Sequence, residues 1–240
     1  MLNVMLNWRE YCNGFLVQRQ ACDWEGKCLA IVSALNNIPI RFINNNINNI
    51  TADETDKLKN NGWVPSGTVP WVSSIIGEEI KPNYFPKFLN KYVTRRIWNE
   101  DKWPMRKVFI KPADRHKRFN GFVTSGNYCG KKKGPFICSD VVNFINEWRY
   151  YIAYGKLIGA YWYWGKEDNE IEAPKLNIDW PENWCGTADF GELDDGRIEL
   201  IESHPPFACG WYGKNHNDYA EFLALGWNWL YNERGYNREF

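Results

Sequence analysis

The dipeptide Asp195-Gly196 constrains the fold most, because it joins two runs in which apolar and polar residues alternate. A two-residue hairpin turn of type I′ needs a positive φ at both positions, and Asp-Gly satisfies that need. Counting outward from such a turn gives the expected cross-strand pairs, which are Leu193 with Ile198, Gly191 with Leu200, and Asp189 with Glu202. The sequence therefore predicts two carboxylates directly opposite each other on neighbouring strands.

The alternation assigns the side chains of this hairpin to two faces. We expect Asp189 and Glu202 on the less solvated face, together with Leu193, Ile198 and Leu200. The solvated face is expected to carry the remaining polar residues, Glu192, Asp194, Arg197 and Glu199. Two opposed carboxylates away from solvent must protonate or bind a cation, and Mg²⁺ held by carboxylates and substrate phosphates is one solution. The alternative is a structural hairpin whose acids reach solvent at a strand end.

Composition excludes several classes of protein. The 240 residues are enough for one large domain or two lobes around a sizeable core. Lys plus Arg and Asp plus Glu both number 29, so no net charge draws the chain onto nucleic acid or an anionic membrane. The chain has no apolar run long enough for a membrane span and no signal-peptide pattern.

The cysteines and histidines argue against a disulfide framework or a zinc site. The 7 cysteines are odd in number and contain no CxxC pair, and the 3 histidines show no zinc-ligand spacing. This usage is typical of reduced thiols. We therefore expect a cytoplasmic protein, in the host cytoplasm if it is viral.

The first hundred residues contain short apolar runs that suit a small α/β layer. Thr51 to Glu54 matches a capping box, which predicts a short helix ending near Gly62. The stretch from Trp63 to Val72 is typical of a strand interrupted by prolines. Pro86 begins a segment with the spacing of a half-buried helix, which ends at Arg95-Arg96. Paired arginines most often form a solvated helix end. Near the other end of the chain, Asn217 is positioned to cap a final helix.

A cationic segment follows the predicted strand over 107–112, which delivers Lys111 at its end. Arg115 to Arg118 precede Phe119-Asn120-Gly121, so this turn could fold over an anion, with lysines as mobile charges for phosphate. Such a run of charge is otherwise a solvated face or a nucleic-acid patch.

Two further strands are expected after this segment. Residues 136–144 read as an apolar strand, and Glu147, Arg149 and Tyr151 share one face of the next strand, where Glu147 and Arg149 most often form a structural pair. The run from Leu157 to Trp164 supplies a neighbouring strand after Tyr154-Gly155, a poorer turn than Asp195-Gly196.

Four motifs, taken in order, resemble the ATP-grasp superfamily: FIKP, KRFNGF, SDVVNFINEWRYYI, and the ADFG hairpin that ends in IESHPPF. The resemblance is to small stand-alone members known mainly from phages and bacteria, and it extends over Lys107 to Gly213. It implies an α+β fold in which two α+β lobes hold ATP between them, after a small α/β N-terminal region. The implied divisions are residues 1–100 for that region, 101–138 for the small lobe and 139–240 for the large lobe.

The resemblance also implies roles for individual residues. Lys111 would contact the ATP phosphates, Lys117 would be the second lysine, and Arg149 would point toward phosphate. The segment 139–144 would contact adenine, through Asp140, Val141 and Val142, and Glu147 would bind the ribose hydroxyls. Asp189 and Glu202 would be the magnesium ligands, and Arg96 stands near an N-terminal cation of many members.

His204 departs from the family pattern, which often has asparagine two positions after the second acidic ligand. Imidazole suits magnesium poorly. His204 therefore either contacts phosphate or substrate, or the metal has fewer protein ligands, or the site has lost catalysis.

The residue types favour an ATP-dependent carboxylate–amine ligase that acts through an acylphosphate, with ATP and Mg²⁺ as cofactors. Its partners would be a small-molecule or peptide carboxylate and an amine, with nucleic acid less favoured and no membrane. The alternatives are a phosphotransferase acting on a hydroxyl and a non-catalytic nucleotide-binding module.

Overall fold

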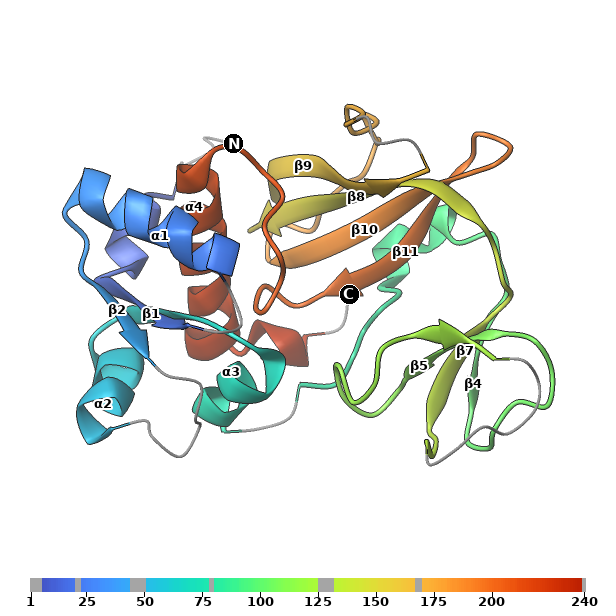
Figure 1. Cartoon of the computed structure of the whole chain (residues 1–240), viewed down its shortest axis with the longest axis horizontal. Coiled ribbons are helices and arrows are strands. Elements are labelled where there is room, and N and C mark those ends of the chain that lie inside the picture. Colours follow the sequence, from blue (N-terminus) through green and yellow to red (C-terminus); the bar gives the residue numbers. More distant parts are fainter. Residues whose placement is uncertain are drawn as a thin grey trace.

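The computed structural model describes residues 6–19, 23–43, 51–77, 80–124, 132–166 and 170–238. Within these ranges, three sheets define an N-terminal region, a small lobe and a large lobe (Figure 1). The arrangement agrees with the predicted α+β class. None of the helices in the described ranges has the length and apolarity that a bilayer span requires.

The N-terminal region is a parallel sheet in the order β2-β1-β3. Its strands are β1 (Gly14–Gln18), β2 (Ile40–Ile43) and β3 (Trp63–Ser66). All five residues of β1 are buried, as expected for the central strand of a parallel sheet. The helical elements of this region are η1 (Trp8–Tyr11), α1 (Asp23–Asn36), α2 (Ala52–Asn60) and α3 (Val69–Ile76).

Two predictions for this region have different outcomes. The capping box at α2 is confirmed, because Thr51 and Glu54 exchange side-chain and backbone hydrogen bonds. The strand predicted over Trp63 to Val72 is wrong beyond Ser66, since α3 begins at Val69. Pro70 lies in the first turn of α3, where its missing N–H leaves no helical hydrogen bond unmade.

The small lobe is a four-stranded sheet in the order β4-β7-β5-β6. Its strands are β4 (Ile97–Glu100), β5 (Phe109–Pro112), β6 (Phe122–Val123) and β7 (Phe136–Ser139). Val108, Ile110, Phe136 and Cys138 form a core of their own. The lobe therefore has its own apolar centre, separate from the main core.

Two elements near this lobe are shorter than predicted. The helix expected to reach Arg95-Arg96 is a 3-10 helix, η3 (Lys87–Tyr92). The strand expected over 136–144 ends at Ser139, because the next residues cross from the small lobe to the large lobe. Moreover, β4 pairs with β7, so the small-lobe sheet includes residues before 101.

The large lobe is an antiparallel sheet in the order β11-β10-β8-β9. Its strands are β8 (Phe144–Ala153), β9 (Lys156–Gly165), β10 (Gly186–Leu193) and β11 (Ile198–His204). The helices that follow are α4 (His216–Trp227), the π-helical turn η4 (Asn228–Asn232) and the 3-10 turn η5 (Gly235–Asn237). The predicted cap of α4 is displaced, because the side chain of Asn215 accepts a hydrogen bond from the backbone of Asn217.

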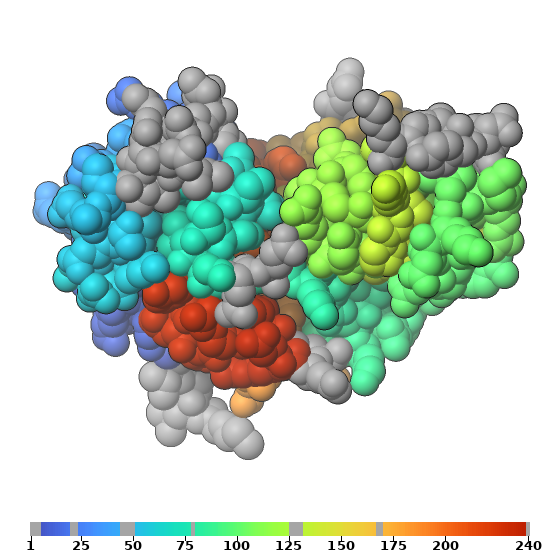
Figure 2. Space-filling model, turned by 90° about the horizontal axis from the view of Figure 1, so that it is seen from below, coloured from blue at the N-terminus to red at the C-terminus, as the bar shows by residue number. Residues whose placement is uncertain are grey.

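Helix α4 joins the N-terminal region to the large lobe. It lies between the two sheets (Figure 1) and contacts α1, β3 and β8. Most of its residues are buried, and one apolar core includes residues from β1, α1, α4, β8 and β10. The small lobe stands apart from this body, and α3 lies across a hollow from it on the lower face (Figure 2).

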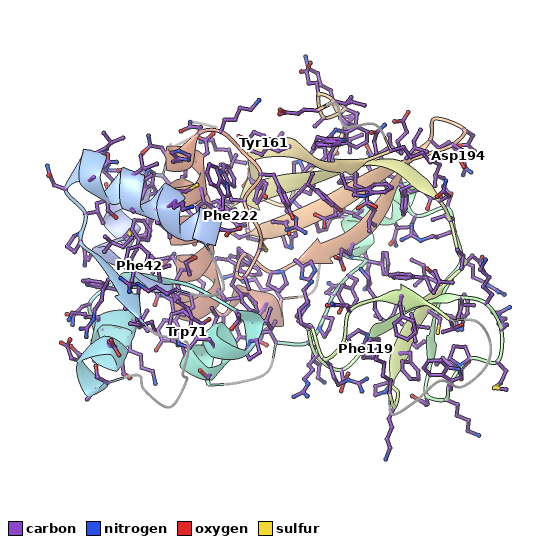
Figure 3. All side chains as sticks on the ribbon, in the orientation of Figure 1. Phe42, Trp71, Phe119, Tyr161, Asp194 and Phe222 are labelled. Carbon is purple, nitrogen blue, oxygen red and sulfur yellow. The ribbon has the colours of Figure 1, made fainter. Side chains whose placement is uncertain are left out.

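The two hairpin turns of the large lobe differ from expectation. Tyr154 and Gly155 form a two-residue turn with φ of 49° and 71°, so Ala153 pairs with Lys156. At the tip labelled by Asp194 (Figure 3), the loop instead has three residues, since Leu193 bonds with Arg197 and Gly196 alone has positive φ. A type I turn followed by a left-handed glycine has this geometry.

The longer loop shifts the register by one residue, which makes two predicted pairs wrong. Gly191 pairs with Glu199 instead of Leu200, and Ile198 pairs with Glu192 instead of Leu193. A β-bulge at Ile201 removes the shift, so the predicted pair of Asp189 with Glu202 is confirmed.

The bulge also changes which side chains share a face. Glu199 now lies on the face of Asp189 and Glu202, whereas Leu200 pairs with Phe190 on the other face. Glu199 is 1% exposed, so its predicted contact with solvent is wrong. The reason is the single extra residue in β11.

Candidate active site

A cavity of about 450 Å³ lies between the small and large lobes. Its walls come from β5, β6, the crossing segment, β8, β9 and β11. The predicted site residues that line it are Lys111, Asp140, Val141, Val142, Glu147 and Glu202. The fold thus brings together, at one cavity, residues that lie up to 91 positions apart in the sequence.

A smaller cavity of about 170 Å³ adjoins it and shares Lys111, Gly121 and Glu202 as lining residues. Lys117 and His204 line only the smaller of these two cavities. Lys117 has a φ of 56°, a left-handed backbone that is uncommon outside glycine. The two predicted lysines therefore occupy different positions, Lys111 between the cavities and Lys117 at the far side of the smaller one.

Lys111 is held in place by β5 and by its partners. Its Nζ forms an ion pair with Glu202 Oε2 and lies 5.1 Å from the centre of the Tyr84 ring. The side chain is 11% exposed. Gly121 packs against it so closely that an added Cβ would lie 3.0 Å from Lys111 Cγ. This close approach of the backbone explains the glycine of the KRFNGF motif.

Glu202 carries a charge that its neighbours stabilise. Burial alone would raise its pKa, but Lys111 and His204 hold the pKa well below its usual range through charge and hydrogen bonds. His204 Nε2 lies 3.2 Å from Glu202 Oε1. Glu202 is therefore an ionised carboxylate at the junction of the two cavities.

Arg149 and Asp189 form a bidentate pair across β8 and β10. The Nε–Oδ1 and Nη2–Oδ2 distances are both 2.7 Å, and Asp189 is 1% exposed. Burial opposes the charge of Arg149, but the carboxylate of Asp189 raises the pKa of Arg149 well above its usual value. Arg149 also lies beside the rings of Tyr163 and Tyr212, which stack on each other. Asp189 orients this cation and lines neither cavity.

Glu147 shares the face of Arg149, as predicted from strand alternation. Burial raises its pKa, and the charges of Asp189 and Glu202 raise it further, while a 2.5 Å hydrogen bond from the Tyr163 hydroxyl lowers it. This carboxyl group therefore has a stronger tendency to keep a proton than an exposed glutamate, and it is free to accept a ribose hydroxyl only through its remaining lone pairs.

Arg96 lies outside both cavities. It pairs with Asp140 at 3.4 Å, with side-chain exposures of 58% and 47%, and covers the Trp98 ring. Its neighbour Arg95 lines the larger cavity instead. Arg95 donates hydrogen bonds to Glu199 and to the carbonyls of Leu200 and Ile201, at 2.8, 2.8 and 3.2 Å. Arg95 thus supports the bulge that orients Glu202.

Sequence reasoning missed several residues of this site: Tyr84, Arg95, Tyr163 and Glu199. The paired arginines were a signal for Arg95, but one residue of the pair could not be preferred over the other. Tyr84 lies outside any periodic segment, so its contact with Lys111 had no signal in the sequence.

The carboxylates fit a magnesium ion that is held mainly by substrate phosphates. Within the described residues, no group of three or more His, Cys, Asp and Glu side chains forms a metal-binding cluster. Glu202 borders the cavity, and Asp189 lies opposite it on β10. Two carboxylates are enough when phosphate oxygens and water complete the coordination.

The fold is that of ATP-grasp ligases. D-cycloserine synthetase DcsG superposes with a TM-score of 0.53 at 12% identity, covering 88% of this chain and 99% of that one. The D-alanine–D-alanine ligase from Bacillus anthracis complexed with ATP gives 0.50 at 11% identity, covering 92% and 99%. At such identities these likenesses concern the fold alone, and no curated protein matches the sequence.

The family is shown by a sequence model. The model of an ATP-grasp domain, family 2 of its clade, matches residues 88–222. That range holds every predicted site residue and more than half of the chain. The chain therefore belongs to this family of ATP-grasp domains.

Proposed function

We propose that this chain is an ATP-dependent carboxylate–amine ligase that acts through an acylphosphate. The observation that carries the proposal is that Lys111 and Glu202 border both cavities. A nucleotide in the larger cavity would place its terminal phosphate at these residues, with the smaller cavity beyond it. The acceptor of the phosphoryl group would enter from the side of Lys117 and His204.

The roles follow from position and charge. The backbone of the crossing segment, with Asp140, Val141 and Val142, borders the cavity where adenine would bind, and Glu147 would meet the ribose. Lys111 and Arg149 would neutralise the phosphates, and Lys117 would hold the acceptor. Magnesium, held by Glu202 and Asp189, would supply further charge stabilisation.

The reaction would proceed in two balanced steps. A carboxylate oxygen of the acyl donor attacks the γ-phosphorus, the bond to the β-phosphate oxygen breaks, and ADP leaves. An amine then attacks the acyl carbon, the bond from that carbon to the phosphate oxygen breaks, and the nitrogen releases a proton as phosphate leaves. A carboxylate donor is ionised at neutral pH and needs no general base in the first step.

The described cysteines do not favour a covalent enzyme intermediate. All five are buried: Cys12, Cys28, Cys138, Cys185 and Cys209. Burial raises the pKa of each, so each stays a weakly nucleophilic thiol. This supports an acceptor that comes from a substrate.

A phosphotransferase acting on a hydroxyl is the second candidate. His204 favours it, because a base beside the smaller cavity could take the proton of a hydroxyl acceptor. In this structure His204 contacts Glu202, which suits a role in orienting the carboxylate as well.

Trapping with hydroxylamine tests the reaction type. Purified protein with ATP, Mg²⁺ and a panel of amino acids, peptides and dicarboxylates should release ADP and form an acyl hydroxamate with the correct donor. Glu202→Gln is the inactive control, and His204→Asn should keep ligation while it would cripple a kinase. A stable phosphorylated product in the wild type, lost in His204→Asn, would instead establish phosphotransfer to a hydroxyl.

A further inference from the structure

A cavity of about 800 Å³ lies between α3 and the loop 113–118 of the small lobe, and it is larger than the cavity of about 450 Å³ expected to hold the nucleotide. Figure 2 views the hollowed face where α3 and the small lobe meet. The α3 side of the wall includes Val69, Pro70, Ser73 and Ser74. The opposite wall is formed by four consecutive residues, Arg115, His116, Lys117 and Arg118.

Two of these four residues present their charges to the cavity. Arg115 and Lys117 are exposed, whereas His116 between them is 6% exposed. Arg118 is committed to the loop, because it donates to Asp114 at 2.8 Å and to the carbonyls of Lys133 and Pro135 at 2.7 and 3.2 Å. Arg118 therefore anchors the loop, and Arg115 and Lys117 give the cavity its positive charge.

The described lining residues of this cavity include no aspartate or glutamate. They also include no exposed aromatic ring, since Phe207 is 5% exposed and His116 is buried. Single-stranded nucleic acid binds to cationic grooves that offer aromatic stacking surfaces. The cavity therefore suits an anion without bases, such as a carboxylate.

Lys117 connects this cavity to the phosphate end of the candidate active site. It lines both the cavity of about 800 Å³ and the cavity of about 170 Å³ that contains Glu202 and His204. An anionic group at Lys117 would thus be beside the position of the terminal phosphate. Arg115, two residues earlier on the same exposed side of the loop, lines only the larger of these two cavities.

We propose that the cavity between α3 and the loop 113–118 binds the acyl donor, and that this donor is an acidic peptide. Its reacting carboxylate contacts Lys117 and a second carboxylate contacts Arg115. This inference rests on the proposed ligase function. A cavity of this volume accepts more than one amino acid, and the spacing of the two cations selects a donor with at least two anionic groups.

Calorimetry with a defined pair of peptides tests the assignment. The full chain, saturated with a non-hydrolysable ATP analogue and Mg²⁺, is titrated with glutamyl-glutamyl-glutamate and with alanyl-alanyl-alanine. We expect the acidic peptide to bind at least tenfold more tightly. Arg115→Gln should weaken its binding at least fivefold and leave the affinity for the ATP analogue unchanged.

Two further variants locate the effect. Arg106→Gln removes the same charge from the same lobe, but Arg106 stacks on Trp98 and lines none of these cavities, so it should leave peptide binding unchanged. Ser73→Trp fills the cavity from the α3 wall and should block the acidic peptide without affecting the ATP analogue. Melting temperatures confirm that each variant is folded.

Four outcomes would overturn the inference: equal binding of the two peptides, no binding of the acidic peptide at millimolar concentration, an equal loss in Arg106→Gln, or displacement of the peptide by a uridine tetranucleotide of equal charge. The proposed function fails separately. Specific peptide binding with no amide formed by any amine would reject the ligase and keep the cavity assignment. Ligation of neutral donors at an unchanged rate in Arg115→Gln would reject this inference alone.

Discussion

The guanidinium of Arg95 and the carboxylate of Glu199 form an ion pair of 2.8 Å in which the side chains are 6% and 1% exposed. The same guanidinium donates to the carbonyls of Leu200 and Ile201, at the bulge of β11. One buried cation from the segment before β4 therefore holds the backbone that turns Glu202 toward the cavity. This arrangement makes Arg95 a positioning residue for the candidate site.

Arg95→Gln should destabilise the protein, because it leaves Glu199 as an unpaired buried charge. We expect the free energy of unfolding to fall by roughly 3–5 kcal/mol. Arg96→Gln is the matched control and should change it by less than about 0.5 kcal/mol, since Arg96 is exposed. Urea denaturation measures both. Similar losses in the two variants would contradict the assigned difference.

Lys111→Met should weaken binding of the ATP analogue, whereas Lys117→Met should slow turnover more than binding. Lys111 lies on a strand with its charge paired to Glu202, and Lys117 lies on an exposed loop. Losing a hydrogen bond to a charged group costs about 1.5–3 kcal/mol, roughly tenfold to a hundredfold in affinity. Calorimetry gives the affinities and ADP release gives the rates. Equal losses of affinity in both variants would argue against this division of roles.

Glu202→Gln and Asp189→Asn test the magnesium assignment. In the wild type we expect Mg²⁺ to increase the affinity for the ATP analogue, and both variants should lose that increase together with Mg²⁺-dependent turnover. The comparison is made by titration with and without Mg²⁺. If Asp189→Asn keeps the full increase, Asp189 serves only to orient Arg149.

His116 should make stability fall in mild acid. Burial, together with the neighbouring charge of His204, lowers the pKa of His116 from 6.5 to about 3, and neither ring nitrogen has a hydrogen-bond partner. Between these two values the unfolded chain binds the extra proton, so stability is lost as the pH falls below about 6.5 and recovered as it rises. At pH 5 the loss amounts to about 2 kcal/mol.

The comparison with His116→Phe isolates this effect. The His116 ring packs against Tyr84 and His204, and a phenyl ring can keep those contacts without titrating. The difference in stability between wild type and variant should therefore change by that amount between pH 7 and pH 5, measured by urea denaturation. A constant difference across this range would show that His116 is not buried in its neutral form.

Local patterns in the sequence determined much of the fold. The alternation of β8 predicted that Glu147 and Arg149 share a face, and the capping box predicted the start of α2. The ordered motifs predicted the ATP-grasp family, which the family model confirms. These features depend on neighbours in the chain, or on motif order, and both can be read without a structure.

Tertiary contacts decided the details of the candidate site. The register of β10 and β11 depends on a three-residue loop and on the bulge at Ile201, where Arg95 contacts backbone more than a hundred positions away in sequence. No local pattern encodes such a contact, because its free energy arises only when the small-lobe connection packs on β11. The burial of Glu199, and the position of Arg95 at the cavity in place of Arg96, follow from the same packing.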